Sequence, residues 1–312
     1  MSVRILIGDV RERLADLPDE SVHCVVTSPP YWGLRDYGVA GQIGLEATPT
    51  EYVETMVGVF REVRRVLRSD GTLWMNLGDS YAATTKGSGG HNEKQDSNVG
   101  SWMADRKWRI PEGIKPKDLV GIPWRVAFAL QADGWWLRQD IIWSKPNPMP
   151  ESVTDRCTKA HEYLFLLSKS ERYHFDAATI AEPSAYPGDN RALRTDTRKA
   201  YVPLCADNGS RARTGNPTGE NRNRRSVWTV ATQPYSEAHF ATFPPALIEP
   251  CILAGCPEGG TVIDPFGGAG TTGLVADRLR RNAILIELNP DYAAMARRRI
   301  EGDAPMFAEV VA

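Results

Sequence analysis

The sequence has few cysteines, and none of them forms a metal-binding or redox motif. Five cysteines occur in 312 residues, an odd number with no C-x-x-C pair among them. Cys251 and Cys256 are separated by four residues and have no histidine nearby, which is a poor match to a zinc site. We therefore expect buried free thiols, no disulfide and no bound metal.

The chain also lacks a long apolar run and a strong net charge. No stretch approaches the roughly 18–20 apolar residues of a membrane span, and the polar N-terminus does not resemble a signal peptide. A cytoplasmic protein with no membrane contact is therefore expected. The formal net charge of −2 gives no overall basic character, while a hydrophobic fraction of 42% suffices for one large domain, with or without an insert.

The most informative stretch is Thr-Ser-Pro-Pro-Tyr-Trp at residues 27–32. It follows the apolar run 22–26, which predicts a buried strand. The two prolines end that strand and stiffen the loop, and loops at the carboxyl ends of strands are where open α/β sheets bind ligands. Carbonyl oxygens, the Ser28 hydroxyl and the Tyr31 ring together suit a planar group that carries an exocyclic NH2. A Pro-Pro turn that only packs core aromatics is the alternative.

A glycine-rich segment near the other end predicts a second ligand-binding loop. A short apolar strand ends at Asp264 and is followed by glycines and an amphipathic helix. Gly268, Gly270 and Gly273 fit the spacing G-x-G-x-x-G, and Glu287 closes the next strand nineteen residues after Gly268. Glycines let the backbone approach a ligand, and the acid suits ribose hydroxyls. This spacing fits NAD as well as any other adenosine cofactor, and a tight turn without a ligand is the alternative.

Together the two motifs resemble the DNA amino-methyltransferases, which use S-adenosylmethionine to methylate cytosine N4 or adenine N6. The order, with the catalytic loop first and the cofactor loop last, is similar to the β group of that family, a circular permutation of the usual arrangement. The resemblance extends from about Ile5 to about Ile300, with a gap in the middle. It implies an α/β, Rossmann-like methyltransferase fold, circularly permuted, with an Arg-rich irregular insert.

The implied plan is one methyltransferase domain whose two halves flank the insert. Residues 1–170 form the catalytic half, 171–235 the target-recognition region and 236–312 the cofactor-binding half. The N-terminal strand 3–7 and helix 10–17 supply what should follow the last helix of the cofactor half. Joining the ends restores an unbroken β-α-β-α-β-α-β order, so we expect the termini to lie close together.

The resemblance also implies site residues. The catalytic residues are Ser28, Pro29, Pro30 and Tyr31. The cofactor-binding residues are Asp9, Phe240, Thr242, Asp264, Phe266, Gly268, Gly270, Thr271, Thr272 and Glu287. Asp9 takes the place where the family binds the adenine of the cofactor, and a surface turn after Gly8 is the alternative. Phe240 and Thr242 lie in the segment that closes over the methionine end, and packing under the start of a helix is the alternative.

The stretch 191–225 concentrates positive charge. It holds eight arginines and one lysine against three acidic residues, in a context rich in Gly, Asn, Thr and Pro. Such a segment can follow phosphates and read guanine edges, and the β group has its target-recognition region here. The expected DNA contacts are Arg191, Arg194, Arg211, Arg213, Arg222, Arg224 and Arg225. A solvated surface loop is the alternative.

The remaining segments predict scaffold and one further loop. Apolar spacing predicts helices at 51–67, 121–132 and 291–300 and one ending near Ala254, and strands at 72–77, 136–143 and 162–167, the last of them antiparallel. The irregular stretch 82–117 is long for a compact domain, so we expect a loop over the active site or DNA, with plain disorder as the alternative.

The implied mechanism needs neither a metal nor a covalent enzyme intermediate. The Ser28 hydroxyl and the Pro29 carbonyl accept the amino hydrogens of a flipped base, Tyr31 stacks on its ring, and the nitrogen lone pair attacks the sulfonium methyl. Serine at position 28 favours cytosine N4, because the family's adenine enzymes mostly carry aspartate there. Adenine N6 is the alternative.

Three other functions are alternatives. A protein glutamine methyltransferase uses a similar loop but has the unpermuted motif order. A nicotinamide dehydrogenase would leave residues 28–32 without a role. A DNA-binding relative without activity is disfavoured because a competent residue fills every motif position. The expected partner is double-stranded DNA, in a restriction-modification context, and the oligomeric state is open between monomer and homodimer.

Overall fold

The computed structural model describes the chain as two compact units. Described are residues 1–33, 38–82, 110, 113–184, 221–233, 235, 242–303 and 309–311. The first unit, here called the sheet unit, spans 1–175 and 226–312, and the second, the insert unit, spans 176–225. In the insert unit, β6 (Glu182–Pro183) pairs antiparallel with β7 (Asn221–Arg222).

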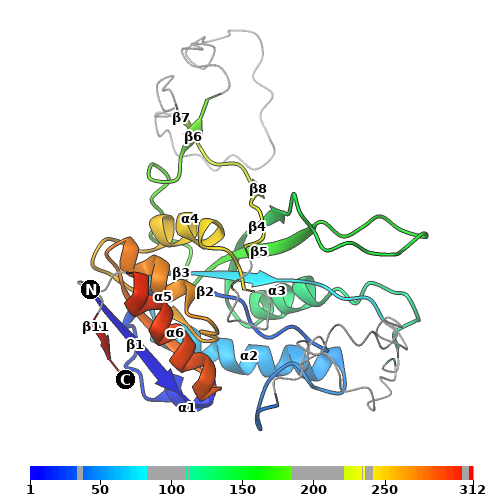
Figure 1. Ribbon diagram of the computed structural model, residues 1–312, viewed down its shortest axis with the longest axis horizontal. Helices are drawn as coiled ribbons and strands as arrows, with labels where there is room; N and C mark the ends of the chain where they lie inside the picture. The colour runs from blue at the N-terminus through cyan, green and yellow to red at the C-terminus, as the bar shows by residue number, and fades with distance from the viewer. Residues whose placement is uncertain are drawn as a thin grey trace. The chain divides into compact units, whose positions relative to one another are not determined.

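In the described part of the chain, nine strands of the sheet unit form one mostly parallel sheet (Figure 1). Its order is β11-β1-β10-β9-β2-β3-β5-β4-β8. The strands are β1 (Ser2–Ile7), β2 (Val22–Thr27), β3 (Leu67–Leu77), β4 (Trp136–Ser144), β5 (His161–Ser168), β8 (Val227–Thr229), β9 (Thr261–Asp264), β10 (Asn282–Glu287) and β11 (Glu309–Val311). Only β5 runs antiparallel to its neighbours β3 and β4, as predicted.

The permuted order expected from the sequence is confirmed. The chain runs from β9 through α5 (Thr271–Arg278), β10, α6 (Pro290–Asp303) and then, across the joined ends, β1, α1 (Val10–Ala15) and β2. Strands β9, β10 and β1 are neighbours, whereas β2 lies on the other side of β9. Because the strand order reverses between β9 and β2, their carboxyl ends form the kind of switch point where α/β sheets bind ligands. Ser2 pairs with Glu309, so the two ends lie side by side as expected.

Helices cover both faces of the sheet. On one face, α1, α2 (Pro49–Val66) and α3 (Ile122–Ala132) share a core with inward side chains of β2, β3 and β5. On the other face, α4 (Pro245–Gly255) packs on β2 and β3, while α5 and α6 cover β9, β10 and β1. Helix α2 begins with a capping box: Glu51 N donates to Thr48 Oγ1, and Thr48 N donates to the Glu51 carboxylate.

The sequence predictions of helices and strands hold, with small shifts at the ends. The expected helix 51–67 begins earlier, at Pro49, and the expected strand 72–77 begins at Leu67. The short edge strands β8 and β11 were not predicted. Strand β8 lies in the sheet although 171–235 was assigned to target recognition, so the sheet unit resumes at Ser226.

The described cysteines are free, but they are not all buried as expected. Cys24, Cys251 and Cys256 are buried, whereas Cys157 is exposed in the connection between β4 and β5. In the described ranges, no cluster of three or more His, Cys, Asp or Glu residues could hold a metal ion. None of the described helices is both long and apolar enough to cross a membrane.

The contact of α4 with the sheet predicts the effect of one added methyl group. A Cβ at Gly255 would lie 2.5 Å from Thr72 Oγ1 and 2.7 Å from Trp74 Nε1, so Gly255→Ala should lower the free energy of unfolding by about 1–3 kcal/mol. Gly58 of α2 has no atom within 4 Å of such a Cβ, so Gly58→Ala should raise it by about 0.5–1 kcal/mol. Urea unfolding measures both. Equal effects of the two variants would contradict this packing.

Candidate active site

The carboxyl ends of β9, β10, β1, β2 and β3 open into a cavity of about 520 Å³. The residues after β4 also line it, so all six strand ends converge on one space within the sheet unit. Most of the site residues expected from the sequence line this cavity: Asp9, Ser28, Pro29, Pro30, Tyr31, Thr242, Asp264, Phe266, Gly268, Thr271 and Glu287. The catalytic and cofactor loops, more than two hundred residues apart in the chain, therefore meet here.

Two expected cofactor residues do not line the cavity. Gly270 is the N-cap of α5 with φ of +74°, and a Cβ there would lie 2.8 Å from the Ala296 side chain of α6. Its glycine is thus required by backbone conformation and helix packing. The buried Thr272 hydroxyl donates to Asp264 Oδ2 at 2.7 Å and so turns away from the cavity. Both residues shape the loop, and their contact with the cofactor stays a prediction.

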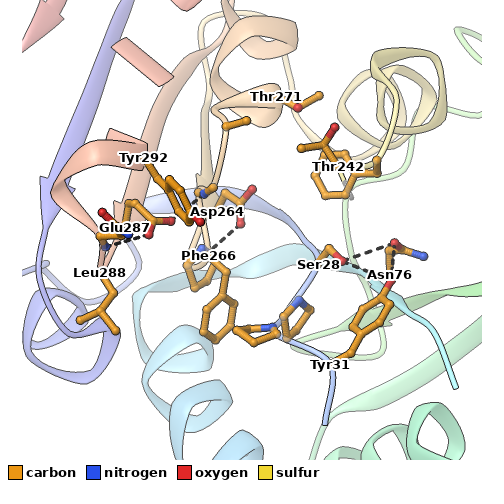
Figure 2. A pocket seen from close by; sticks show the side chains of 18 of the residues that line it. Ser28, Tyr31, Asn76, Thr242, Asp264, Phe266, Thr271, Glu287, Leu288 and Tyr292 are labelled. Atoms are coloured by element: carbon orange, nitrogen blue, oxygen red, sulfur yellow. Dashed lines mark hydrogen bonds between the residues drawn. The ribbon is translucent and has the colours of Figure 1, made fainter. Parts of the chain in front are cut away.

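The buried carboxyl of Asp264 links the two motifs (Figure 2). Its Oδ1 accepts from the Thr27 hydroxyl at 2.7 Å and from Phe266 N at 3.0 Å, while Oδ2 accepts from Thr272. Burial raises the pKa of Asp264 to about 6, although these hydrogen bonds favour the charged form. One side chain thereby ties the end of β2 to the glycine loop and to the start of α5.

Glu287 and Asp9 bring acidic groups to one end of the cavity. Glu287 Oε2 accepts from Gly268 N, and Oε1 accepts from Asn289 N, both at 2.8 Å. Burial raises the pKa of Glu287. Asp9 Oδ1 accepts from Arg11 N and Nε at 2.8 Å, and this Arg11 contact lowers the pKa of Asp9. Both Glu287 oxygens keep a lone pair for a ligand, and so does Asp9 Oδ2, which accepts one hydrogen bond from Arg11 Nη2.

Apolar side chains lie beside these acids. Figure 2 shows Phe266, Leu288 and Tyr292 around Glu287, and all three line the cavity. Apolar side chains flanked by carboxylates suit a purine nucleoside. The faces of its base are apolar, and its sugar carries polar hydroxyls.

At the opposite end of the cavity, several hydrogen-bond acceptors lie around Ser28. Ser28 Oγ lies 3.4 Å from both Asn76 Oδ1 and the Tyr31 hydroxyl (Figure 2). Asn76 Nδ2 donates to Tyr163 O at 3.1 Å, which turns Oδ1 toward Ser28. In the described chain the carbonyl of Pro29 accepts no hydrogen bond, whereas that of Pro30 accepts one from the Tyr52 hydroxyl at 2.9 Å.

An ion pair lies behind Tyr31. The Tyr31 hydroxyl is 2.8 Å from Glu162 Oε2 and 3.1 Å from Asn76 Oδ1, and it donates to one of them at a time. Lys145 pairs with the other oxygen of Glu162 and lies 4.2 Å from the centre of the Trp143 ring. Burial and the nearby Glu162 carboxylate raise the pKa of Tyr31 well above its usual range, so the phenol stays neutral.

Sequence reasoning missed Asn76, Glu162 and Lys145. Asn76 carries a usable signal, because it is a lone amide in the apolar strand 72–77. Glu162 and Lys145 carry little sequence signal. An acidic residue at the start of one strand and a lysine just after another strand are both common at protein surfaces. Parallel pairing of β3 with β2 places Asn76 beside Ser28, and antiparallel pairing of β5 with β3 and β4 brings Glu162 and Lys145 to the same end of the sheet.

Several expected residues lie outside the described part of the chain. They are Phe240, Arg191, Arg194, Arg211 and Arg213, together with most of the stretch 82–117. In the insert unit, Arg222 Nε and Arg225 Nε both donate to Glu182 Oε1, at 2.9 and 2.7 Å. Arg224 lies between them in the chain. The role of these three arginines in DNA binding stays a prediction.

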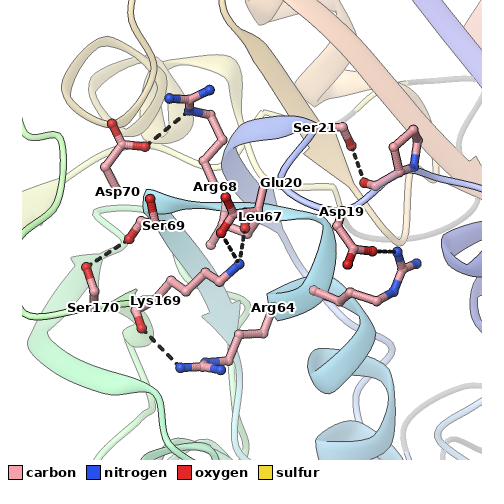
Figure 3. A network of polar contacts seen from close by, with 12 residues as sticks. Asp19, Glu20, Ser21, Arg64, Leu67, Arg68, Ser69, Asp70, Lys169 and Ser170 are labelled. Carbon is pink, nitrogen blue, oxygen red and sulfur yellow. Dashed lines mark hydrogen bonds and ion pairs between the residues drawn. The ribbon is translucent and has the colours of Figure 1, made fainter.

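A second charged hollow lies at the opposite edge of the sheet (Figure 3). Lys169 Nζ donates to Leu67 O at 2.6 Å and to Glu20 Oε1 at 3.1 Å, and Arg64 donates to Lys169 O. Arg65 pairs with Asp19. Because these charges contact one another and backbone carbonyls, we interpret this hollow as a brace between β5, β3 and the turn before β2.

Comparison with known proteins decides the family. A family model described as DNA methylase matches residues 22–298. This chain belongs to the DNA methylase family. The resemblance to N4/N6 amino-methyltransferases and the Rossmann-like fold are thereby confirmed. The match also separates this DNA methylase from nicotinamide dehydrogenases and protein glutamine methyltransferases.

Similar proteins cover nearly the whole chain. Type II methyltransferase M.SmaI of Serratia marcescens is 48% identical over 299 residues, which cover 96% of this chain and 91% of that protein. M.Cfr9I of Citrobacter freundii is 48% identical over 296 residues, which cover 95% of this chain and 87% of that protein.

Two solved structures share the fold. TTHA0409 of Thermus thermophilus, complexed with S-adenosyl-L-methionine, has a TM-score of 0.60 at 25% identity and covers 99% of each chain. PvuII DNA methyltransferase, described as cytosine-N4-specific, has a TM-score of 0.63 at 22% identity, covering 96% of this chain and 86% of that one.

The buried Asp264 carboxyl predicts a pH-dependent stability. Its pKa is about 6 in the folded chain against 3.8 ordinarily, so its contribution is fully present below about pH 4 and is lost as the pH rises through 6. Asp264→Asn keeps an acceptor for Thr27 and Phe266 and cannot ionise. Relative to this variant, the wild type should lose at most about 3 kcal/mol of unfolding free energy between pH 4 and 7. Urea unfolding across that range tests this, and a constant difference would contradict it.

Proposed function

We propose that this DNA methylase transfers the methyl group of S-adenosylmethionine to N4 of a cytosine flipped out of double-stranded DNA. The observation that carries the proposal is a single cavity with two unlike ends. Carboxylates and a glycine loop lie at one end, and neutral acceptors around Ser28 lie at the other. A nucleoside cofactor and a base amino group can therefore meet in one space.

The residues present at the first end fit S-adenosylmethionine. Glu287 would accept hydrogen bonds from the ribose hydroxyls, Asp9 would accept one from the adenine amino group, and Phe266, Leu288 and Tyr292 would surround the adenine ring. When bound, the cofactor supplies an electrophilic methyl group on a sulfonium. The complex of TTHA0409 with S-adenosyl-L-methionine supports this assignment.

The residues at the other end fit an exocyclic amino group. Ser28 can donate its proton to Asn76 Oδ1, since the Asn76 amide is held in place by Tyr163 O. The lone pairs of Ser28 Oγ then remain available, and with the Pro29 carbonyl they accept the two amino hydrogens. Accepting these hydrogens localises the nitrogen lone pair and stabilises the positive charge that develops during attack.

Orientation supplies the rest of the rate enhancement. The Tyr31 hydroxyl is held by Glu162 and Asn76, so its ring is a fixed surface on which the flipped base stacks. The bound cofactor would supply its methyl group to an amino nitrogen held by Ser28 and the Pro29 carbonyl, so no covalent enzyme intermediate is needed.

Cytosine N4 is favoured over adenine N6 by Ser28 and by the fold shared with the cytosine-N4-specific PvuII enzyme. The names of M.SmaI and M.Cfr9I further support a type II restriction-modification context for this chain. Its DNA substrate supports action in the cytoplasm, and the insert unit is the proposed target-recognition region.

Sequencing of native DNA from cells expressing this chain tests the proposal. We expect N4-methylcytosine at one short recurring sequence, and a smaller methylated fraction of those sites in cells that express Ser28→Ala at the same level. N6-methyladenine at a recurring sequence would assign the chain to adenine instead. Unmodified DNA, with the chain folded and bound to S-adenosylmethionine, would mean a DNA-binding relative without activity.

Loss of the Ser28 acceptor should slow chemistry without weakening binding. Ser28→Ala should lower kcat about 10- to 1,000-fold with little change in the KM for DNA, because the lost interaction is strongest in the transition state, when the nitrogen becomes positive. Single-turnover methylation measures the step. Ser21→Ala, at the opposite edge of the sheet, is the matched control. If Ser28→Ala is unstable but has normal activity per folded molecule, the loop is merely structural.

A further inference from the structure

One apolar side chain at the cavity is unusually exposed. Met149 is 84% exposed, more than any other large hydrophobic residue in the described part of the chain. It nevertheless lines the cavity together with Ser28 and Tyr31. A residue that both lines a cavity and faces solvent lies at its mouth.

The segment that carries Met149 is stiff. Pro146, Pro148 and Pro150 alternate along it, and each fixes its own φ. It belongs to the connection between β4 and β5, which reaches beyond the ends of these strands in Figure 1. The exposure of Met149 is therefore a property of a constrained backbone.

Side-chain contacts fix this segment at both ends. On one side, Thr232 N donates to Asn147 Oδ1 at 3.0 Å, and Asn147 Nδ2 donates to Thr232 O at 3.4 Å. On the other side, the Glu151 carboxylate accepts from Arg156 at 2.7 Å and from Lys159 N at 3.1 Å. Met149 is held between these two anchors.

The proposed reaction brings an apolar partner to this mouth. When a base leaves the duplex, it opens a gap lined by the faces of the neighbouring bases, and unfilled stacking is unfavourable. Methionine is slender, unbranched and polarisable, so it can enter a gap of that shape. Most of its surface is already free of protein contacts, so it needs no rearrangement to do so.

We propose that Met149 enters the DNA stack at the place vacated by the target base and keeps the duplex open while that base lies against Tyr31. This inference rests on the proposed function. It assigns Met149 a positioning role: it contacts the neighbouring bases and touches neither the methyl group nor the amino group.

The test compares two duplexes that differ only opposite the target. In one the target base is normally paired, and in the other it faces an abasic site, so little energy is needed to extrude it. On the paired duplex, Met149→Ala should methylate about 10-fold more slowly than wild type. On the abasic duplex, its methylation rate should be within about 2-fold of the wild-type rate. Met149→Leu should retain most activity on both.

A control variant and three other outcomes make the test decisive. Phe128→Ala removes another exposed apolar side chain, 55% exposed and outside the cavity lining, and should match wild type on both duplexes. Equal slowing of Met149→Ala on both duplexes overturns the inference, because Met149 would then serve the base pocket or the cofactor. An unaffected Met149→Ala overturns it as well. If wild type methylates neither duplex, the proposed function itself fails.

Discussion

The arrangement of the site depends on one buried carboxyl. Asp264 lies where the strand order reverses between β9 and β2, and its oxygens bind Thr27, Thr272 and the backbone of Phe266. Burying this group is unfavourable, as its pKa of about 6 shows, and three hydrogen bonds offset that cost. Since Ser28 follows Thr27 and Phe266 begins the glycine loop, this one contact sets the spacing between the two loops that must present base and methyl donor.

The two ends of the cavity differ in charge, and this difference suits transfer between a cationic donor and a neutral amine. Glu287 and Asp9 are acidic groups at the cofactor end. At the base end the groups nearest Ser28 are neutral, because Asn76 is an amide and the pKa of Tyr31 is raised. The Glu162 carboxylate behind them is paired with Lys145. In the proposed reaction, Ser28 would therefore face the amino group without a competing net charge.

The backbone is constrained both in the loops that line the site and at the far edge of the sheet. Prolines begin two residues after the end of β2 and of β4, and Asn147 after β4 is further tied to Thr232. At the far edge of the sheet, Lys169 and Arg64 brace β5 against β3 (Figure 3). A base that has left its duplex has many conformations, so a preformed acceptor loop and stacking surface reduce the entropy that must be lost before reaction.

The sequence by itself determined the permuted strand order, the proline loop after β2, the glycine loop and Glu287. These features are local, because proline and glycine restrict their own backbone and apolar spacing marks each strand. Tertiary structure alone decided which side chains face the cavity. Asn76 lies 48 residues from Ser28 and meets it through the parallel pairing of β3 with β2, while Glu162 lies 131 residues from Tyr31 and meets it through the antiparallel register of β5. Packing against α6 likewise explains why residue 270 is glycine, and the bond to Asp264 holds the Thr272 hydroxyl within the loop, which no local pattern could reveal.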